Sequence, residues 1–292
     1  MNTIPSSELI INNDGSIFHL HIKPHELADT VILVGDPGRV KMVSDYFSTI
    51  ETQAQNREFV SATGLYNGQR LTVVSTGIGT DNIDIVVNEL DALANIDFAT
   101  RTVKPVHRKL TILRLGTSGG LQPHLQLGDF VFSAISIGFD GLLNFYARRN
   151  EVCLLDYEAA FVTHTHWNKQ HTAPYFVRAS EKLAQLFSGT TVEGMTISAP
   201  GFYGPQGRVL RLPLANPQIN ERIESFRFDN RCITNFEMES SAIAGLAKLL
   251  GHEAGTICCI IANRVGLTAL TDYKPAVQKM IELALEKLTG GK

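Results

Sequence analysis

The stretch TVILVGDPGRVKMVSDYF, residues 30–47, joins an apolar run to a turn and then to an amphipathic segment. The run TVILV is short, continuous and rich in β-branched residues, which is typical of a buried strand. The turn GDPGR follows directly, and the residues after it have a helical pattern. We therefore predict a strand, a turn and a helix, in the order from which α/β folds are built.

The same order recurs along the chain. RLTVVSTGIG (70–79) predicts a strand that ends in glycines, and 81–95 predicts an amphipathic helix after it. LTILRLGTSGG (110–120) repeats the strand and its glycines. Other predicted elements are strands within 129–137, 191–204 and 252–264 and a C-terminal helix within 272–288. Strands that alternate with helices predict an α/β fold around one sheet.

NFEMESSAIAGLAKLLG (235–251) changes from a β-favouring pattern to a helical one and ends at Gly251, a typical C-cap. Glu237 and Glu239 flank Met238 at this junction. Two interpretations stay open on this stretch alone. Glu239 is either a first-turn acid favoured by the helix dipole or part of a binding site.

The composition excludes several classes of protein. Of the 292 residues, 44% are hydrophobic and 19% charged, and the net charge of −3 gives no basic field for nucleic acid. No apolar run is long enough to cross a membrane. The N-terminus has no signal-peptide pattern. The four cysteines have no metal-ligand spacing, so we expect reduced thiols in a cytoplasmic protein.

Unusual stretches come directly after most of the predicted strands, where ligands of α/β proteins gather. Gly35 permits close backbone approach, and Arg39 lies in a first helical turn, which suggests an anionic ligand. Arg114 lies within an apolar strand and needs a partner. Thr117 and Ser118 beside it suit a phosphate-like anion. A structural turn with a solvent-facing Arg39 is the alternative, and the glycines lack dinucleotide-loop spacing.

APGFYGPQGR (199–208) offers an aromatic pair, an amide and a guanidinium. Phe202 and Tyr203 can stack on a heterocycle. Gln206 presents a donor beside an acceptor, and Arg208 presents a fork of donors. These groups match the edge of uracil, where carbonyls flank an N–H. The alternative is a glycine-rich surface turn.

The chain resembles the uridine phosphorylases of the nucleoside phosphorylase family. The resemblance rests on FHL (18–20), GDPGRV, NREF (56–59), STGIG, LRLGTSGGLQP, FYGPQGR, NFEMESSA and ANR (262–264), in the order in which the family has them. It covers nearly the whole chain. It implies a single nucleoside phosphorylase-like domain over 1–292, with a central mixed, twisted β-sheet flanked by helices.

The resemblance also implies roles for particular residues. Phosphate is expected at Gly35, Arg39, Arg57, Arg114 and Thr117. Ribose is expected at His19, Glu237, Met238 and Glu239. The base is expected at Phe202, Gln206, Arg208, Ile261, Ala262 and Arg264. Arg114, Glu239 and Arg208 are the expected catalytic residues. His19 and Arg57 are expected to reach a neighbouring subunit's site, which implies at least a homodimer.

The implied reaction is phosphorolysis of uridine or a related pyrimidine nucleoside, with inorganic phosphate as co-substrate and no cofactor. Purine-specific relatives carry an aspartate near Asn263, so its absence favours pyrimidine. Some relatives hold a monovalent cation near Glu58 and Ile78. Asn82 stands there in place of a serine, and we expect no metal.

Residues 96–110 and 145–175 are predicted to be surface insertions, the second irregular and rich in histidine. Its H-x-H-x4-H pattern lacks a supporting carboxylate for a metal. Three other functions stay open: a broader or purine-type nucleoside phosphorylase, a nucleosidase of the same fold, and a non-catalytic nucleoside-binding protein. The arginines at positions 39, 57 and 114 argue against the nucleosidase.

Overall fold

The strand predicted at the start of residues 30–47 is β1 (Thr30–Val34), which lies inside a twelve-stranded mixed sheet. The computed structural model describes residues 3–290. The other strands are β2 (Thr49–Asn56), β3 (Phe59–Tyr66), β4 (Gln69–Ser75), β5 (Ile96–Asp97), β6 (Thr102–Val103), β7 (Thr111–Gly120), β8 (Phe130–Gly138), β9 (Tyr175–Arg178), β10 (Val192–Ser198), β11 (Arg227–Phe228), β12 (Arg231–Glu237), β13 (Glu253–Asn263) and β14 (Thr268–Ala269).

The α-helices are α1 (Gly38–Ser44), α2 (Thr80–Asn95), α3 (Arg149–Val152), α4 (Leu155–Thr165), α5 (Glu181–Phe187), α6 (Ile219–Ser225), α7 (Ser240–Leu249) and α8 (Lys274–Leu288). Two 3-10 turns are η1 (Leu142–Phe145) and η2 (Gly204–Gln206). The sheet runs in the order β11-β12-β10-β8-β13-β7-β1-β4-β3-β2, with β9 paired to β8 and β14 to β13. The predicted α/β class with a mixed sheet is confirmed.

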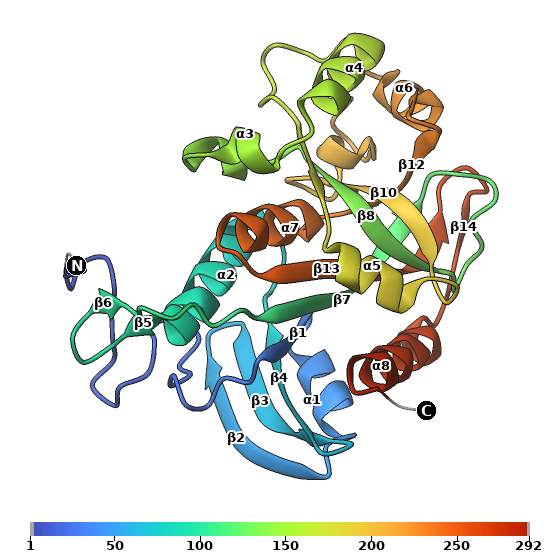
Figure 1. Cartoon of the computed structure of the whole chain (residues 1–292). Helices are drawn as coiled ribbons and strands as arrows, with labels where there is room; N and C mark the ends of the chain where they lie inside the picture. Colours follow the sequence, from blue (N-terminus) through green and yellow to red (C-terminus); the bar gives the residue numbers. More distant parts are fainter. Residues whose placement is uncertain (1–2, 291–292) are drawn as a thin grey trace.

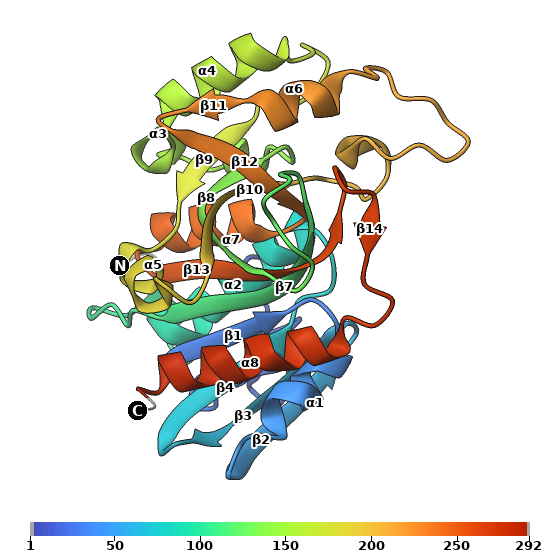
Figure 2. The same ribbon diagram turned by 90° about the vertical axis from the view of Figure 1, so that its right-hand side faces the viewer.

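Helices cover both faces of the sheet (Figure 1). α2 and α7 pack on one face, where apolar side chains such as Val86 and Leu246 are buried together. α1, α5 and α8 cover the other face, and Figure 2 shows α8 lying along it beside α1. Burial on two faces explains the continuous apolar runs in the sequence of the central strands.

The prediction of an irregular, solvated insertion over 145–175 is wrong for α4. Tyr157 and Phe161 lie one helical turn apart on this helix and are buried in a cluster with Phe176 and Phe226. The three histidines of the segment are exposed, and the Nε2 of His164 lies 3.0 Å from a carbonyl of α6. The segment therefore contributes to a core of its own and supports α6.

The segment 96–110 is largely exposed and carries the β5–β6 hairpin, which is separate from the main sheet. Arg101 in its turn donates to backbone carbonyls of Ile4, Pro5 and Leu9. The hairpin thus holds the N-terminal segment in place.

Within residues 3–290, no helix combines the length and apolar character that a bilayer span requires.

Gly251 ends α7 as predicted. Its φ is +82°, a value that suits glycine, and its N–H donates to the carbonyl of Lys248. The next N–H, of His252, donates to the carbonyl of Ala247 at 2.8 Å. This pair of bonds is a Schellman motif, which satisfies the last carbonyls of the helix and returns the chain to the sheet at β13.

Candidate active site

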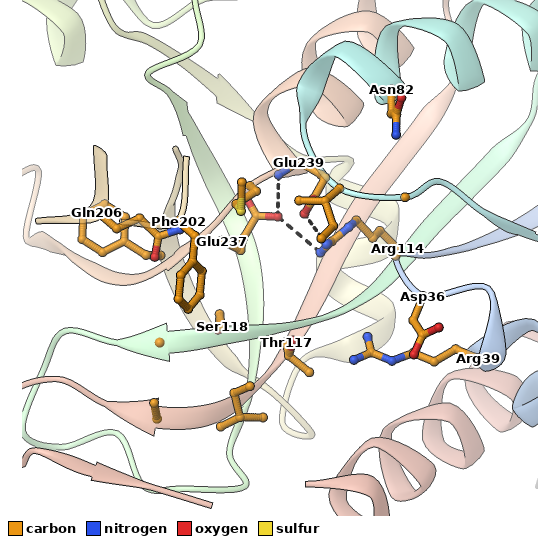
Figure 3. Close-up of a pocket in the computed structure, with 18 of the residues that line it drawn as sticks. Asp36, Arg39, Asn82, Arg114, Thr117, Ser118, Phe202, Gln206, Glu237 and Glu239 are labelled. Atoms are coloured by element: carbon orange, nitrogen blue, oxygen red, sulfur yellow. Dashed lines mark hydrogen bonds and ion pairs between the residues drawn. The ribbon is translucent and has the colours of Figure 1, made fainter. Parts of the chain in front are cut away.

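A cavity of about 750 Å³ lies where the strand-end loops meet. Its lining comprises Gly35, Asp36, Pro37, Arg39, Glu58, Gly77, Ile78, Asn82, Arg114, Thr117, Ser118, Gly119, Phe202, Gln206, Arg208, Phe236, Glu237, Met238, Glu239, Ile261 and Ala262. Figure 3 shows its two ends, with Gln206 and Phe202 at one and Arg39 and Asp36 at the other. Arg114, Glu237 and Glu239 lie between them.

Arg114 is buried between two carboxylates. Its Nη2 donates to Oε2 of Glu239, and its Nη1 lies 3.3 Å from Oε2 of Glu237. Burial lowers the pKa of Arg114, but the attraction of Glu239 and Glu237 is larger in sum and raises it above the ordinary value. Among the described residues, the Nε of Arg114 has no hydrogen-bond partner. A buried unpaired donor in a cavity wall suits an anionic ligand.

Glu237 has its acceptor capacity filled by the protein. Its Oε1 accepts from the hydroxyls of Ser198 and Ser240 and from the Ser240 N–H, and its Oε2 accepts from the Glu239 N–H. The Arg114 contact adds to these. Glu237 is therefore the residue that satisfies the first N–H groups of α7.

Glu239 keeps free acceptor capacity. Its Oε1 accepts from the Gly79 N–H at 2.8 Å, and its Oε2 accepts from Arg114. A carboxylate has about four lone-pair positions, so two remain for a ligand. Burial raises the pKa of Glu239, the charge of Arg114 opposes this, and the charge of Glu237 adds to it. The interpretation of Glu239 as a helix-dipole acid alone does not fit this geometry.

The anion end of the cavity is formed by the turn after β1. Asp36 accepts from the Gly38 N–H at 2.8 Å, which shapes the entry to α1. Arg39 projects from the first turn of α1, and its guanidinium carbon lies 6.0 Å from the ring centre of Tyr273. Thr117 lines the cavity beside it from β7. The structure therefore brings Gly35, Arg39, Arg114 and Thr117 into one wall.

The base end of the cavity has an ordered set of polar atoms. The Nη1 of Arg208 donates to Oε1 of Gln206 and to the carbonyl of Phe202. The guanidinium lies 3.9 Å from the centre of the Phe202 ring. Because a guanidinium only donates, it fixes the amide oxygen of Gln206 on its own side and leaves the amide nitrogen on the other.

The end of β13 contributes Ile261 and Ala262 to the cavity. Arg264, expected at the base, is not among the residues lining the cavity. Its Nη1 donates to the carbonyl of Gln206, and its Nη2 lies 3.4 Å from that of Gly207. Its expected contact with a base stays a prediction.

Asn263 also follows Ala262, and its side chain is buried with both amide ends in use. The nitrogen donates to the carbonyls of Gln122 and Leu125, and the oxygen accepts from the N–H groups of Val265 and Gly266. The side chain therefore holds two loops together. It is not available to form a hydrogen bond with a ligand.

His19 and Arg57 do not line the cavity of their own chain. The Nδ1 of His19 lies 2.6 Å from Oε1 of Glu89. Arg57 is exposed at the turn between β2 and β3, with a φ of +54°. Asn56, next to Arg57, donates to the His19 carbonyl at 2.9 Å. The two residues thus belong to one surface, outside the cavity.

Comparisons with known proteins identify the family of this chain. Residues 29–289 match the family model described as Phosphorylase superfamily. The chain belongs to this superfamily. A solved nucleoside phosphorylase of Trypanosoma brucei, described as showing uridine phosphorylase activity, is 32% identical with a TM-score of 0.87, and the match covers 97% of this chain and 100% of that one.

Two further relatives of this chain show the range of the superfamily. A uridine phosphorylase of Thermococcus kodakarensis is 29% identical over 89% of this chain and 82% of its own length. A guanosine phosphorylase of Halorubrum lacusprofundi is 27% identical over 85% and 83%. The predicted membership of the nucleoside phosphorylase family is confirmed.

Some residues that line the cavity were not predicted as ligand contacts. Glu58 and Asn82 both line the cavity, and the Asn82 amide donates to Glu58 at 3.2 Å. Gly119 and Phe236 also line it. Gly119 lies within the RLGTSGG stretch, whose glycines already indicated a site. Phe236 lies in an ordinary strand pattern, and its sequence carries no such signal.

Two other groups of side chains bear on metal binding and on nucleophilic chemistry. Asp91, His107 and His252 bring possible ligand atoms within 4.8 Å of one another. The Nδ1 of His252 accepts from the Leu110 N–H, so the ring proton lies on Nε2, which faces Asp91. Neither nitrogen of His252 is therefore free to bind a metal.

Burial raises the pKa of the Cys258 thiol, beside Arg114, to about 12. This thiol stays neutral and is a poor nucleophile.

Proposed function

We propose that this protein cleaves uridine with inorganic phosphate and releases uracil and ribose 1-phosphate. The observation that carries the proposal is the ordered face of Gln206 and Arg208. The amide nitrogen donates, the amide oxygen accepts, and the guanidinium donates. The edge of uracil has the complementary order of carbonyl, N–H and carbonyl. Cytosine has an acceptor and a donor at the last two positions, so it meets like groups there.

The middle of the cavity suits the ribose. Glu239 accepts from the 2′- and 3′-hydroxyls with its free lone pairs and Met238 lies against the sugar. Glu237 borders the ribose but acts by holding Arg114 and the start of α7. As the C1′–N bond breaks, positive charge grows on the sugar, and the Glu239 carboxylate stabilises it. Negative charge grows on uracil, and Arg208 stabilises that.

Phosphate lies at the other end, against Gly35, Arg39, Arg114 and Thr117, with an oxygen aimed at C1′. The buried Nε of Arg114 donates to it. No covalent enzyme intermediate is needed, because positioning and fixed charges supply the catalysis. No cofactor is required.

A second subunit completes the phosphate site in this proposal. The cavity of one chain is lined by four carboxylates and three guanidiniums, a poor balance for a phosphate dianion. Arg57 of a neighbouring chain adds a cation, and His19 beside it reaches the 5′-hydroxyl.

The free state of the four cysteines supports a cytoplasmic protein.

The purine-type alternative fits this site less well. The guanosine phosphorylase relative keeps it open. A purine leaves most easily when it is protonated, but Asn263 has both ends of its amide occupied. The test is uracil release from uridine with and without phosphate, with inosine and cytidine as alternative substrates. Equal release without phosphate, or faster cleavage of inosine, would overturn the proposal.

A further inference from the structure

Two side chains outside the cavity hold the turn that carries Gln206. Asn220 lies on α6, and its Nδ2 is 3.4 Å from the carbonyl oxygens of both Gln206 and Gly207. Arg264, from the end of β13, donates to the same Gln206 carbonyl and approaches that of Gly207. Two elements that are distant in sequence thus meet at two adjacent peptide groups.

The contact with Asn220 is close. Gly207 follows η2 with a φ of +68°, a conformation that suits glycine. A Cβ at Gly207 would lie 2.2 Å from the Nδ2 of Asn220. The turn therefore depends on a glycine for two independent reasons, its dihedral angle and the proximity of the Asn220 amide.

The orientation of the Asn220 amide leaves one of its polar atoms without a partner. Its Oδ1 is buried and, among residues 3–290, has no hydrogen-bond partner. The opposite orientation would point this oxygen at two carbonyl oxygens, which repel it. Buried polar atoms are usually paired, so an unpaired one indicates that another requirement fixes the side chain. Here that requirement is donation to the turn.

We propose that Asn220 and Arg264 are positioning residues for base recognition. They hold the carbonyls of Gln206 and Gly207 and so fix the donor–acceptor–donor face that Gln206 and Arg208 present, without touching the base. This inference rests on the proposed function for its kinetic consequence. Arg264 is thereby given a role through the backbone in place of direct contact with uracil.

Hydrogen exchange of the turn tests the holding contact without any substrate. Asn220→Ala is expected to raise amide exchange at Gln206, Gly207 and Arg208 about tenfold, because the turn loses the hydrogen bonds that Asn220 donates to the carbonyls of Gln206 and Gly207. Exchange in α7 should stay unchanged. Glu221→Ala, at an exposed position of the same helix, is the matched control. Unchanged exchange at the turn would overturn the inference.

The kinetic test separates positioning from general destabilisation. Asn220→Ala should raise KM for uridine about tenfold, leave KM for phosphate unchanged and reduce the preference for uridine over cytidine. In a Gln206→Ala background it should change KM by less than about twofold, because the face it supports is gone. An equal increase in KM for uridine and for phosphate would show a merely structural role. An undiminished effect of Asn220→Ala in the Gln206→Ala background would show the same.

Companion variants keep the test decisive. Asn220→Asp has the same shape but puts a carboxylate against two carbonyls. It should therefore raise both the amide exchange of the turn and the KM for uridine more than Asn220→Ala does. Arg264→Lys keeps the charge but loses the pair of guanidinium donors that approach the two carbonyls. It should raise KM for uridine without altering KM for phosphate. If the wild-type protein does not cleave uridine but Asn220→Ala raises exchange, the holding contact stands and the proposed function fails. If the wild type is active and neither measurement moves, the inference fails alone.

Discussion

Arg114 and Glu239 form a buried ion pair in the wall of the cavity, with side chains only 6% and 4% exposed. The arginine comes from the middle of β7, and the glutamate follows the end of β12. The pair joins the phosphate end of the cavity to the proposed ribose position. A change at either residue therefore affects both charge balance and catalysis.

Arg114→Ala should remove most of the activity. It deletes the donor that strengthens its bond as phosphate attacks, which adds about 2–4 kcal/mol to the barrier. It also leaves two buried carboxylates without their cation, at a cost of about 3–5 kcal/mol in the free energy of unfolding. Steady-state kinetics and urea unfolding measure the two effects.

Arg148→Ala is the matched control for this change, since the Arg148 side chain is 71% exposed in its pair with Glu151. It should alter the free energy of unfolding by no more than about 0.5 kcal/mol. An unchanged rate for Arg114→Ala at saturating phosphate would contradict its assigned contact with phosphate.

The pKa of Glu239 predicts opposite pH trends for activity and stability. Burial raises this pKa in the folded state. The carboxylate is the active form, so kcat/KM for uridine should fall as pH falls through the raised value, above the ordinary glutamate pKa of about 4.3. The folded state binds the proton more tightly, so this group's contribution to stability is full below the unfolded pKa and is lost as pH rises through the folded one.

Glu239→Gln supplies the control for both trends. It cannot titrate, so the acidic limb of its residual activity at saturating phosphate should disappear, and its unfolding should lose that component of pH dependence. An identical limb in the variant would assign the titration to phosphate or to another group.

The shared-site arrangement predicts complementation between two inactive variants. Arg57→Ala and Glu239→Ala protomers, mixed under conditions that exchange subunits, should regain activity because one hybrid site carries neither lesion. Uracil release is measured before and after exchange. No recovery, with exchange proven by a mass-tagged subunit, would indicate that each site is built from one chain.

The small side chain of Ala262 predicts tolerance of a substituent on the base. Ala262 lines the cavity from β13 and pairs with Gly119 of β7. Valine there would add two carbons, and each buried methylene is worth roughly 0.8 kcal/mol. Ala262→Val should therefore lower kcat/KM for 5-methyluridine relative to uridine. An unchanged ratio would place the wall near carbon 5 elsewhere.

Much of the fold followed from local pattern. The apolar runs before Gly35, Gly77 and Gly116 each form a strand of the sheet, and the third strand, β7, continues through its glycines to Gly120. The burial of Tyr157 and Phe161 did not follow, because it depends on aromatic partners from other segments. The β2–β3 hairpin was also missed.

The sequence predicted where the candidate site lies but not the separate roles of its residues. The EMES stretch indicated two carboxylates at one site. That Glu237 caps α7 while Glu239 keeps free lone pairs depends on Ser198 and Gly79, which are distant in sequence. The holding of η2 by Asn220 likewise arises only from the packing of α6.

Product identity tests the central claim most directly. Uridine incubated with the protein in phosphate buffer, followed by phosphorus NMR and chromatography, should yield one ribose 1-phosphate for each uracil released, and Arg114→Ala should yield neither at a comparable rate. Free ribose in place of ribose 1-phosphate, or binding of uridine without cleavage, would contradict the account.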